Sequence, residues 1–311
     1  MIEVVLTYPI IRKDFIDKSL FTLYRYTDPT KFRVIVVDQT LDGWGGDWAA
    51  KVLSHGGKII SQRNGGFAYG ANAGLIQGLR WGVPYLAVVN DDVQMIYDKW
   101  WEDLLEEFKD PRIAAVNPMC PKIAMWGYGM TNGEYLEILP YKEQYTDEDI
   151  VYLKKGDYNE SEIRSRHAFQ IPPSFPFTQR GVVDAFAGWL PVFRRETLIQ
   201  NGLYDERFVW GGGEDYDMMG RIYSCAYPIP REKCNPAYHY RAISTMKSWV
   251  WHWWGKSKDE AQTLDPRLFE GREAWNRLDD LWQPYCDPWG HTREEPKKPL
   301  HRDPVISVHV P

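Results

Sequence analysis

Short runs of apolar residues alternate with amphipathic stretches along the first third of the chain. Residues 4–6, 34–37 and 85–89 are unbroken apolar runs of strand length, whereas residues 14–26 and 99–108 place apolar side chains at helical spacing. Unbroken apolar strands that alternate with helices are typical of parallel sheets covered on both faces. The pattern therefore predicts an α/β fold, a Rossmann-like three-layer α/β/α arrangement with a mostly parallel central sheet.

Polar side chains follow two of these predicted strands directly. Residues 34–37 end at Asp38, and residues 85–89 end at Asn90-Asp91-Asp92. Ligands of parallel sheets bind beyond the carboxyl ends of the strands, and carboxylate oxygens are ligands for hard cations. We interpret residues 90–92 as a metal-diphosphate site. The alternative is an ordinary polar turn, because Asn and Asp are common turn residues.

Small residues are dense where the next predicted helix begins. The helix follows Asn64-Gly65-Gly66, contains Asn72 and continues to about Trp81. A helix N-terminus presents free amides and a positive dipole to a phosphate. The alternative is a tight turn followed by a helix that packs closely on the sheet.

A second acidic motif lies in the other half of the chain. Glu214 and Asp215 follow three glycines and precede a predicted helix, where capping alone would also explain them. Further on, His239 is a lone histidine between aromatic residues, a setting that is more often structural than catalytic.

Composition limits the classes of partner. The 311 residues are 44% hydrophobic and 26% charged, as in globular proteins, and the net charge of -6 argues mildly against nucleic acid as a partner. Fifteen tryptophans suit sugar stacking or interfaces, with buried packing as the alternative. Four of them lie in residues 246–255, a segment that suits a lid, a core element or a peripheral membrane contact.

Nothing in the sequence predicts a membrane-spanning segment or a signal peptide. The first strand begins within a few residues of Met1, without a basic or long apolar leader. The four cysteines are scattered, with no Cys-x-x-Cys pair, as expected of reduced thiols. We therefore expect a cytoplasmic protein.

The order and spacing of the motifs resemble the family 2 type of inverting nucleotide-sugar glycosyltransferases, which have the GT-A fold. The resemblance covers residues 2–241 and implies a nucleotide site at the strand ends. Asp38 would bind the base, and Asn90-Asp91-Asp92 stands in the place of the D-x-D motif, with Asn90 replacing its first acid. The other residues that the resemblance places beside the nucleotide are Asn64, Gly66 and Asn72.

The same resemblance implies roles for the metal and for catalysis. Asp92 and His239 would hold a divalent metal, Mn or Mg, against the diphosphate of a nucleotide-sugar donor. Asp215 would be the general base, with Glu214 holding other hydroxyls of the acceptor. Two tryptophans, for which packing is the alternative, would stack on an acceptor ring: Trp189 and Trp210.

The function expected from this resemblance is metal-dependent inverting transfer from a nucleoside-diphosphate sugar, with UDP as the expected nucleotide, to a hydroxyl of a glycan or another acceptor. Residues 1–245 would form the GT-A domain, with a nucleotide-binding half (1–93) and an acceptor half (94–245), before a Trp-rich extension (246–311). One alternative is a nucleotidyltransferase, although the glycine-rich basic signature of that class is missing after the first strand. The other is a carbohydrate-binding protein with a degenerate transferase fold.

Overall fold

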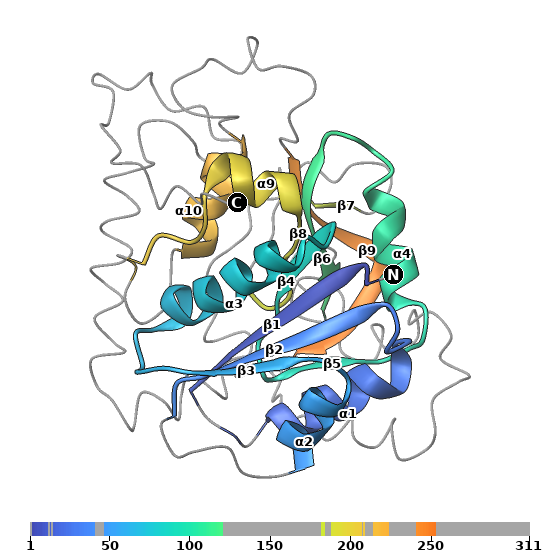
Figure 1. Ribbon diagram of the computed structural model, residues 1–311. Helices are drawn as coiled ribbons and strands as arrows, with labels where there is room; N and C mark the ends of the chain where they lie inside the picture. Colours follow the sequence, from blue (N-terminus) through green and yellow to red (C-terminus); the bar gives the residue numbers. More distant parts are fainter. Residues whose placement is uncertain are drawn as a thin grey trace, which may run out of the picture.

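The strands of the computed structural model form one large sheet with helices on both of its faces (Figure 1). The structure describes residues 2–11, 13, 15–40, 47–120, 182–183, 188–206, 208, 214–223 and 241–252. The strands are β1 (Val4–Ile10), β2 (Phe32–Asp38), β3 (Lys58–Ser61), β4 (Tyr85–Val88), β5 (Val93–Met95), β6 (Ile113–Met119), β7 (Val182–Val183), β8 (Val192–Arg194) and β9 (Arg241–His252). The helices are α1 (Ile16–Tyr26), α2 (Asp47–Ser54), α3 (Phe67–Trp81), α4 (Trp100–Glu107), α9 (Arg195–Asn201) and α10 (Glu214–Tyr223).

The described sheet is mixed, with strand order β3-β2-β1-β4-β8-β6-β9-β5 and β7 paired to β9. Its first four strands are parallel, as the sequence predicted. β8 then runs antiparallel to both β4 and β6, and β5 and β7 run antiparallel to β9. Parallel pairing recurs between β6 and β9, so the expectation of a mostly parallel sheet is confirmed for β1 to β4 and for this pair. The antiparallel pairs all involve β5, β7 or β8, strands of two or three residues that show no period of their own.

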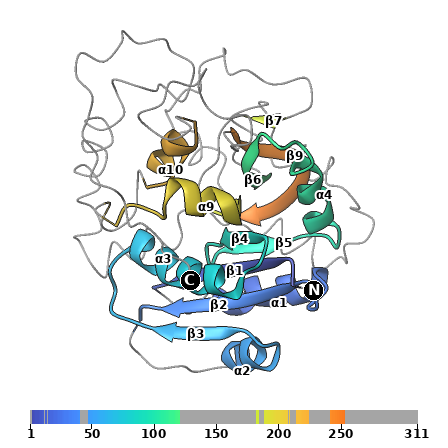
Figure 2. The same cartoon turned by 45° about the horizontal axis from the view of Figure 1, so that its top comes forward.

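Helices cover the parallel strands from two sides, with α3 on one face and α1 and α2 on the other (Figures 1 and 2). α3 packs closely on β1 because glycines recur every four residues along it, at Gly70, Gly74 and Gly78. A Cβ at Gly74 would lie 2.1 Å from Cγ2 of Thr7. Close packing on the sheet therefore accounts for the small residues inside this helix.

The tryptophan-rich segment belongs to the core as far as the structure describes it. Residues 246–252 are the second half of β9, which pairs with β6 on one side and β5 on the other. Trp249 and Trp251 are each only 2% exposed. The domain boundary expected after residue 245 thus falls inside a core strand, and the rest of the expected extension, residues 253–311, lies outside the described residues. No helix in the described part of the chain is long and apolar enough to cross a membrane.

Candidate active site

Several of the polar residues singled out in the sequence lie at one edge of the sheet. β1 to β4 are parallel, so Asp38 at the end of β2, Asn64 beyond β3 and Asn90 beyond β4 lie at the same edge. The turn after β4 is fixed between its neighbours, because Val89 N–H donates to Thr7 O (2.8 Å) and Asn90 N–H to Trp189 O (2.9 Å). The chain that enters β8 therefore meets the acidic turn directly.

Asp92 forms a buried ion pair with His252, the last residue of β9. Its Oδ1 lies 3.1 Å from Nε2 of His252, and both side chains are less than a tenth exposed. Pairing of Val93 with His252 between β5 and β9 brings the two residues together. Burial lowers the pKa of His252, but the Asp92 carboxylate and side-chain hydrogen bonds with Asp92 and Cys120 outweigh it and raise that pKa to about 9.

Once His252 has lost its proton, the pair would offer a metal ion one carboxylate oxygen and one imidazole nitrogen. Mn²⁺, Mg²⁺ and Zn²⁺ sites use such donors to different degrees. Within the described residues no group of three or more His, Cys, Asp or Glu side chains is placed to hold a metal. A cation at this pair would therefore need its other ligands from outside these residues. His239, the expected histidine ligand, lies outside the described residues.

The three side chains of the turn after β4 differ in their surroundings. Asn90 is half-buried, whereas Asp91 and Asp92 are buried. Asp91 lies near β1, where its charge adds slightly to the effect of burial in raising the pKa of Tyr8. Asp92, which pairs with β9, is thus the acid of this turn that faces the other half of the sheet.

The end of β2 presents two buried polar side chains in succession. Asp38 accepts hydrogen bonds at Oδ1 from Thr40 N–H (2.9 Å) and from Thr40 Oγ1 (2.6 Å). The next residue, Gln39, accepts one at Oε1 from Gly65 N–H (3.2 Å). The segment between β3 and α3 is therefore tied to the end of β2.

The loop before α3 enters the helix through a glycine in a left-handed conformation. Gly66 has φ of 89°, a left-handed conformation that favours glycine, and its N–H donates to Oδ1 of Asn64 (3.0 Å). The first backbone amides of α3 therefore lie at the same edge as Asp38 and Asn90. Free amides at a helix N-terminus attract an anion, and the helix dipole strengthens that attraction.

Asn72 has a structural use that needs no nucleotide. Its Oδ1 accepts from Tyr204 N–H (3.0 Å), and its Nδ2 donates to Tyr204 O (2.8 Å) and to Oε1 of Glu206 (2.9 Å). These bonds clamp the loop after α9 to α3. Asn72 therefore positions this loop, and its expected contact with a nucleotide stays a prediction.

Asp215 is connected to the acidic turn after β4 by hydrogen bonds of two neighbouring residues, Gly188 and Trp189. Its Oδ2 accepts a hydrogen bond from Gly188 N–H (3.1 Å), and Gly188 precedes Trp189, whose carbonyl holds Asn90. Asp215 is half-buried, whereas Glu214 is 6% exposed. Both residues start α10. Burial is the main cause that raises the pKa of the nearby Tyr204, and the charges of Asp215 and Glu214 raise it further.

Trp189 is part of the core. It is 1% exposed, its Nε1 donates to Pro118 O (3.2 Å), and its ring lies 6.0 Å from the ring of His252. Packing, rather than stacking on an acceptor, accounts for this residue. Trp210, the other expected acceptor residue, lies outside the described residues.

The sequence matches no protein-family model and no curated protein. Among solved structures, the fold is similar to that of GalNAc-T7 with UDP, GalNAc and Mn²⁺, with a TM-score of 0.51 and 14% identity over 88% of this chain and 54% of that chain. The chain has a GT-A-like fold. It spans about half the length of the GalNAc-T7 chain.

Two further GT-A-like structures give lower scores. The mannosyltransferase PcManGT from Pyrobaculum calidifontis, in complex with GDP-Man and Mn²⁺, has a TM-score of 0.48 and 16% identity over 92% of this chain and 72% of that one. S. aureus TarS 1-349 has a TM-score of 0.45 and 12% identity over 90% and 70% of the two chains.

Two residues of the candidate site could not be recognised from the sequence. His252 was hidden within a tryptophan-rich run, although a histidine that ends a long strand-like segment is a signal of the same kind as Asp38 and Asp92. Gln39 follows a strand end directly, and only its burial, 3% exposed, distinguishes it from an ordinary turn residue.

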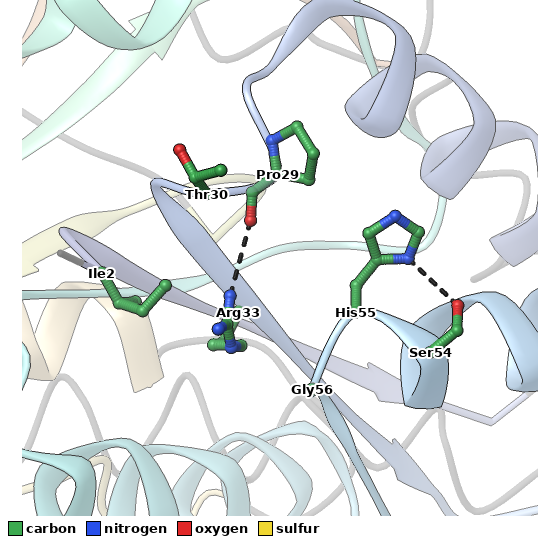
Figure 3. A pocket seen from close by; sticks show the side chains of 7 residues that line it. All are labelled: Ile2, Pro29, Thr30, Arg33, Ser54, His55 and Gly56. Carbon is green, nitrogen blue, oxygen red and sulfur yellow. Dashed lines mark hydrogen bonds between the residues drawn. The ribbon is translucent and has the colours of Figure 1, made fainter.

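A shallow pocket lies far from these residues along the strands (Figure 3). It has a volume of about 570 Å³ and is lined by Ile2, Pro29, Thr30, Arg33, Ser54, His55 and Gly56. Ile2 and Arg33 lie at the amino ends of β1 and β2, opposite the edge where Asp38 and Asp92 lie. This pocket is therefore separate from the candidate active site.

Proposed function

We propose that the protein is a metal-dependent inverting glycosyltransferase that moves a sugar from a nucleoside-diphosphate sugar, a UDP-sugar, to an acceptor hydroxyl. The observation that carries this proposal is the meeting of a carboxylate-imidazole pair and a second carboxylate at one sheet edge, linked through Asn90, Trp189 and Gly188. GalNAc-T7, which has a similar fold, was crystallised with UDP, GalNAc and Mn²⁺.

In this proposal, Asp92 and His252 hold the divalent cation. A divalent cation held there would supply positive charge against the negative charge that develops on a departing nucleoside diphosphate. Oxygen and nitrogen donors suit Mn²⁺. Asn90, two residues before Asp92 in the same turn, would bind ribose or a metal-bound water. His239 remains a prediction as a further ligand.

The nucleotide is bound by the neighbouring strand ends. Asp38 accepts a hydrogen bond from the base, and the first amides of α3, after Gly66, attract the diphosphate. Asn64 supports this arrangement by accepting the Gly66 N–H. The carboxylate that precedes Asp92, Asp91, adds negative charge without a contact that we assign.

Asp215 is the proposed general base. An acceptor hydroxyl is a weak nucleophile, so a carboxylate within hydrogen-bond reach must take its proton as the new bond forms. The Gly188 N–H orients the Asp215 carboxylate for this role, and Glu214 binds other acceptor hydroxyls. A base on the acceptor side implies in-line displacement, which inverts the anomeric carbon.

The variant Asp215→Asn tests the proposal, because it keeps the shape of the side chain and removes the base. We expect sugar transfer to fall by about 100- to 10,000-fold, while UDP still binds in the presence of Mn²⁺. Transfer is measured with a panel of UDP-sugars and glycan acceptors, and binding by calorimetry. If the variant transfers sugar at the wild-type rate, Asp215 is not the general base. If the wild type transfers sugar in EDTA, the reaction does not need a metal.

A further inference from the structure

The hydroxyl of Tyr204, in the loop after α9, is buried without a hydrogen-bond partner among the residues that the structure describes. The residue is 0% exposed, so water at the surface does not reach this group. A buried polar group that makes no hydrogen bond costs free energy, and a phenylalanine would fill the same space without that cost. Packing alone therefore gives no reason for a hydroxyl at this position.

The backbone and the ring of Tyr204 are both held in place. Asn72 of α3 accepts a hydrogen bond from the Tyr204 N–H (3.0 Å) and donates one to the Tyr204 carbonyl (2.8 Å). The ring meets those of Phe67 and Phe193 nearly at right angles, with centroids 5.8 Å and 6.2 Å away. The hydroxyl therefore sits on a fixed ring, and a partner has to approach it.

The same aromatic contacts lead to the proposed base. Gly188, whose N–H donates to Oδ2 of Asp215 (3.1 Å), also lies beside Phe67. A Cβ at Gly188 would be 3.8 Å from that carboxylate oxygen and 3.9 Å from Cζ of Phe67. Phe67, at the start of α3, therefore has the Asp215 carboxylate near the tip of its ring and the Tyr204 ring packed against it.

The charged groups that act on the Tyr204 hydroxyl come from α10. Burial is the main cause that raises the pKa of Tyr204, the charges of Asp215 and Glu214 raise it further, and Arg221 lowers it. Arg221 is itself paired with Asp217 (2.9 Å). The aromatic side chains that pack on the ring from α3 and β8 carry no charge. The phenol therefore stays protonated at neutral pH and offers a proton donor to the carboxylates at the start of α10.

We propose that Tyr204 is a positioning residue that acts through Asp215, by donating a hydrogen bond from its hydroxyl to that carboxylate in the complex with both substrates. This inference rests on the proposed function, in which Asp215 is the general base. Hydrogen bonds at a catalytic base are often long or poorly aligned in the free enzyme and tighten in the complex. Donors from Gly188 and Tyr204 would fix the carboxylate and favour its ionised form, which takes the proton of the acceptor hydroxyl.

The test compares Tyr204→Phe with the wild type, both as the full chain, in sugar transfer with Mn²⁺ and the best pair from the panel of UDP-sugars and glycan acceptors. Values of kcat and KM are measured from about pH 5 to about pH 9, and stability is measured by urea unfolding. Tyr97→Phe is the matched control. Tyr97 is also 0% exposed, but its hydroxyl lies 3.0 Å from Oδ2 of Asp103 and 3.0 Å from the carbonyl oxygen of Lys247.

We expect Tyr204→Phe to unfold at the same urea concentration as the wild type or at a higher one, because the lost hydroxyl has no partner in the described fold. Its kcat should fall by about tenfold, with a change of less than about twofold in KM for the acceptor. The acid limb of its pH profile of kcat should move up by about one pH unit, because a hydrogen bond to a carboxylate favours the ionised form. Tyr97→Phe should unfold at lower urea and keep the wild-type profile.

A second comparison identifies the carboxylate that accepts the bond, because Glu214 also acts on the hydroxyl. The Tyr204→Phe substitution is made in Glu214→Gln as well, where the further loss of about tenfold in kcat should persist. If this loss disappears in the double variant, the hydroxyl acts through Glu214, and the assignment to Asp215 is wrong.

Two other results would overturn the inference and leave the proposed function standing. One is a wild-type kcat and pH profile in Tyr204→Phe. The other is a loss of stability in Tyr204→Phe as large as that in Tyr97→Phe, or a failure to fold, since the hydroxyl would then have a structural role. If the wild type transfers sugar from none of the UDP-sugars, the proposed function fails together with the inference.

Discussion

The buried pair of Asp92 and His252 makes each residue dependent on the other. Removing one partner of a buried ion pair leaves an uncompensated charge and typically costs about 3–5 kcal/mol. The pair sits between the turn after β4 and the end of β9, so it also joins two parts of the sheet. In the proposed function, the same two residues hold the metal.

We predict that His252→Ala lowers the free energy of unfolding by about 3 kcal/mol and removes Mn²⁺ binding. Urea unfolding measures the first effect, and calorimetric titration with Mn²⁺ in the presence of UDP measures the second. His55→Ala, at the opposite edge, is the control and should bind Mn²⁺ normally. Normal Mn²⁺ binding by His252→Ala together with its loss in His239→Ala would assign the ligand to His239 instead.

Gly74 is the residue of α3 with the least space for a side chain. A Cβ there would lie 2.1 Å from Cγ2 and 2.6 Å from Oγ1 of Thr7, a buried residue of β1. We predict that Gly74→Ala destabilises the protein by about 1–3 kcal/mol, because overpacking forces α3 away from the sheet. Urea unfolding is the measurement. Gly188→Ala, where the nearest atom to the new Cβ is 3.8 Å away, should cost clearly less.

The turn between α4 and β6 is stabilised by an ion pair between Asp110 and Arg112. Asp110 accepts hydrogen bonds from Nε (3.0 Å) and Nη2 (2.6 Å) of Arg112, which lower its pKa to about 2. Because an aspartate in an unfolded chain has a pKa of about 3.9, the ionised group stabilises the fold. Its contribution is complete above that value and is lost as the pH falls toward 2.

We predict that Asp110→Asn is less stable than the wild type at pH 6 and that the difference shrinks as the pH falls from about 4 to about 2.5. The pair is partly exposed, so the difference stays below about 1 kcal/mol. Urea midpoints at several pH values measure it. A difference that grows on acidification would contradict the assigned sign.

Elements with a long apolar run or a clear helical period could be predicted from the sequence. β4 (Tyr85–Val88) lies within the predicted run 85–89, and α3 ends at the predicted Trp81. β5 and β8 could not be predicted, because three residues show no periodicity and their place depends on partners far along the chain. The sequence also could not predict that β9 runs parallel to β6, because this direction depends on pairing between segments far apart in the chain.

The candidate site divides in the same way. Asp38 and Asp92 were found because an acid at the end of an apolar run is a local signal. His252 required the register of β5 on β9, and Gln39 required its burial against Gly65 and Gly70, neither of which is local. Trp189 was a misleading candidate, because tryptophans serve sugar stacking and core packing equally well.

At the scale of the whole molecule, the candidate site lies where two parts of the sheet join. Asp38 and the start of α3 come from the parallel strands β1 to β4, whereas His252 ends β9, beyond the antiparallel β8. A nucleoside diphosphate with its metal would contact both parts. A ligand that binds only the folded state stabilises it by mass action, so the metal and the nucleotide should each strengthen the binding of the other.

We predict that UDP and Mn²⁺ together raise the melting temperature by more than the sum of their separate effects. The diphosphate needs a cation to approach Asp92, and the cation needs diphosphate oxygens because the described residues offer it only two side-chain ligands. Coupling of this kind is reciprocal and typically amounts to about 1–3 kcal/mol. Uridine is the control: it has the base and ribose without phosphates, so its shift should be the same in Mn²⁺ and in EDTA. If the UDP shift is also unchanged in EDTA, the metal does not bind at the diphosphate, and Asp92 and His252 form a structural ion pair.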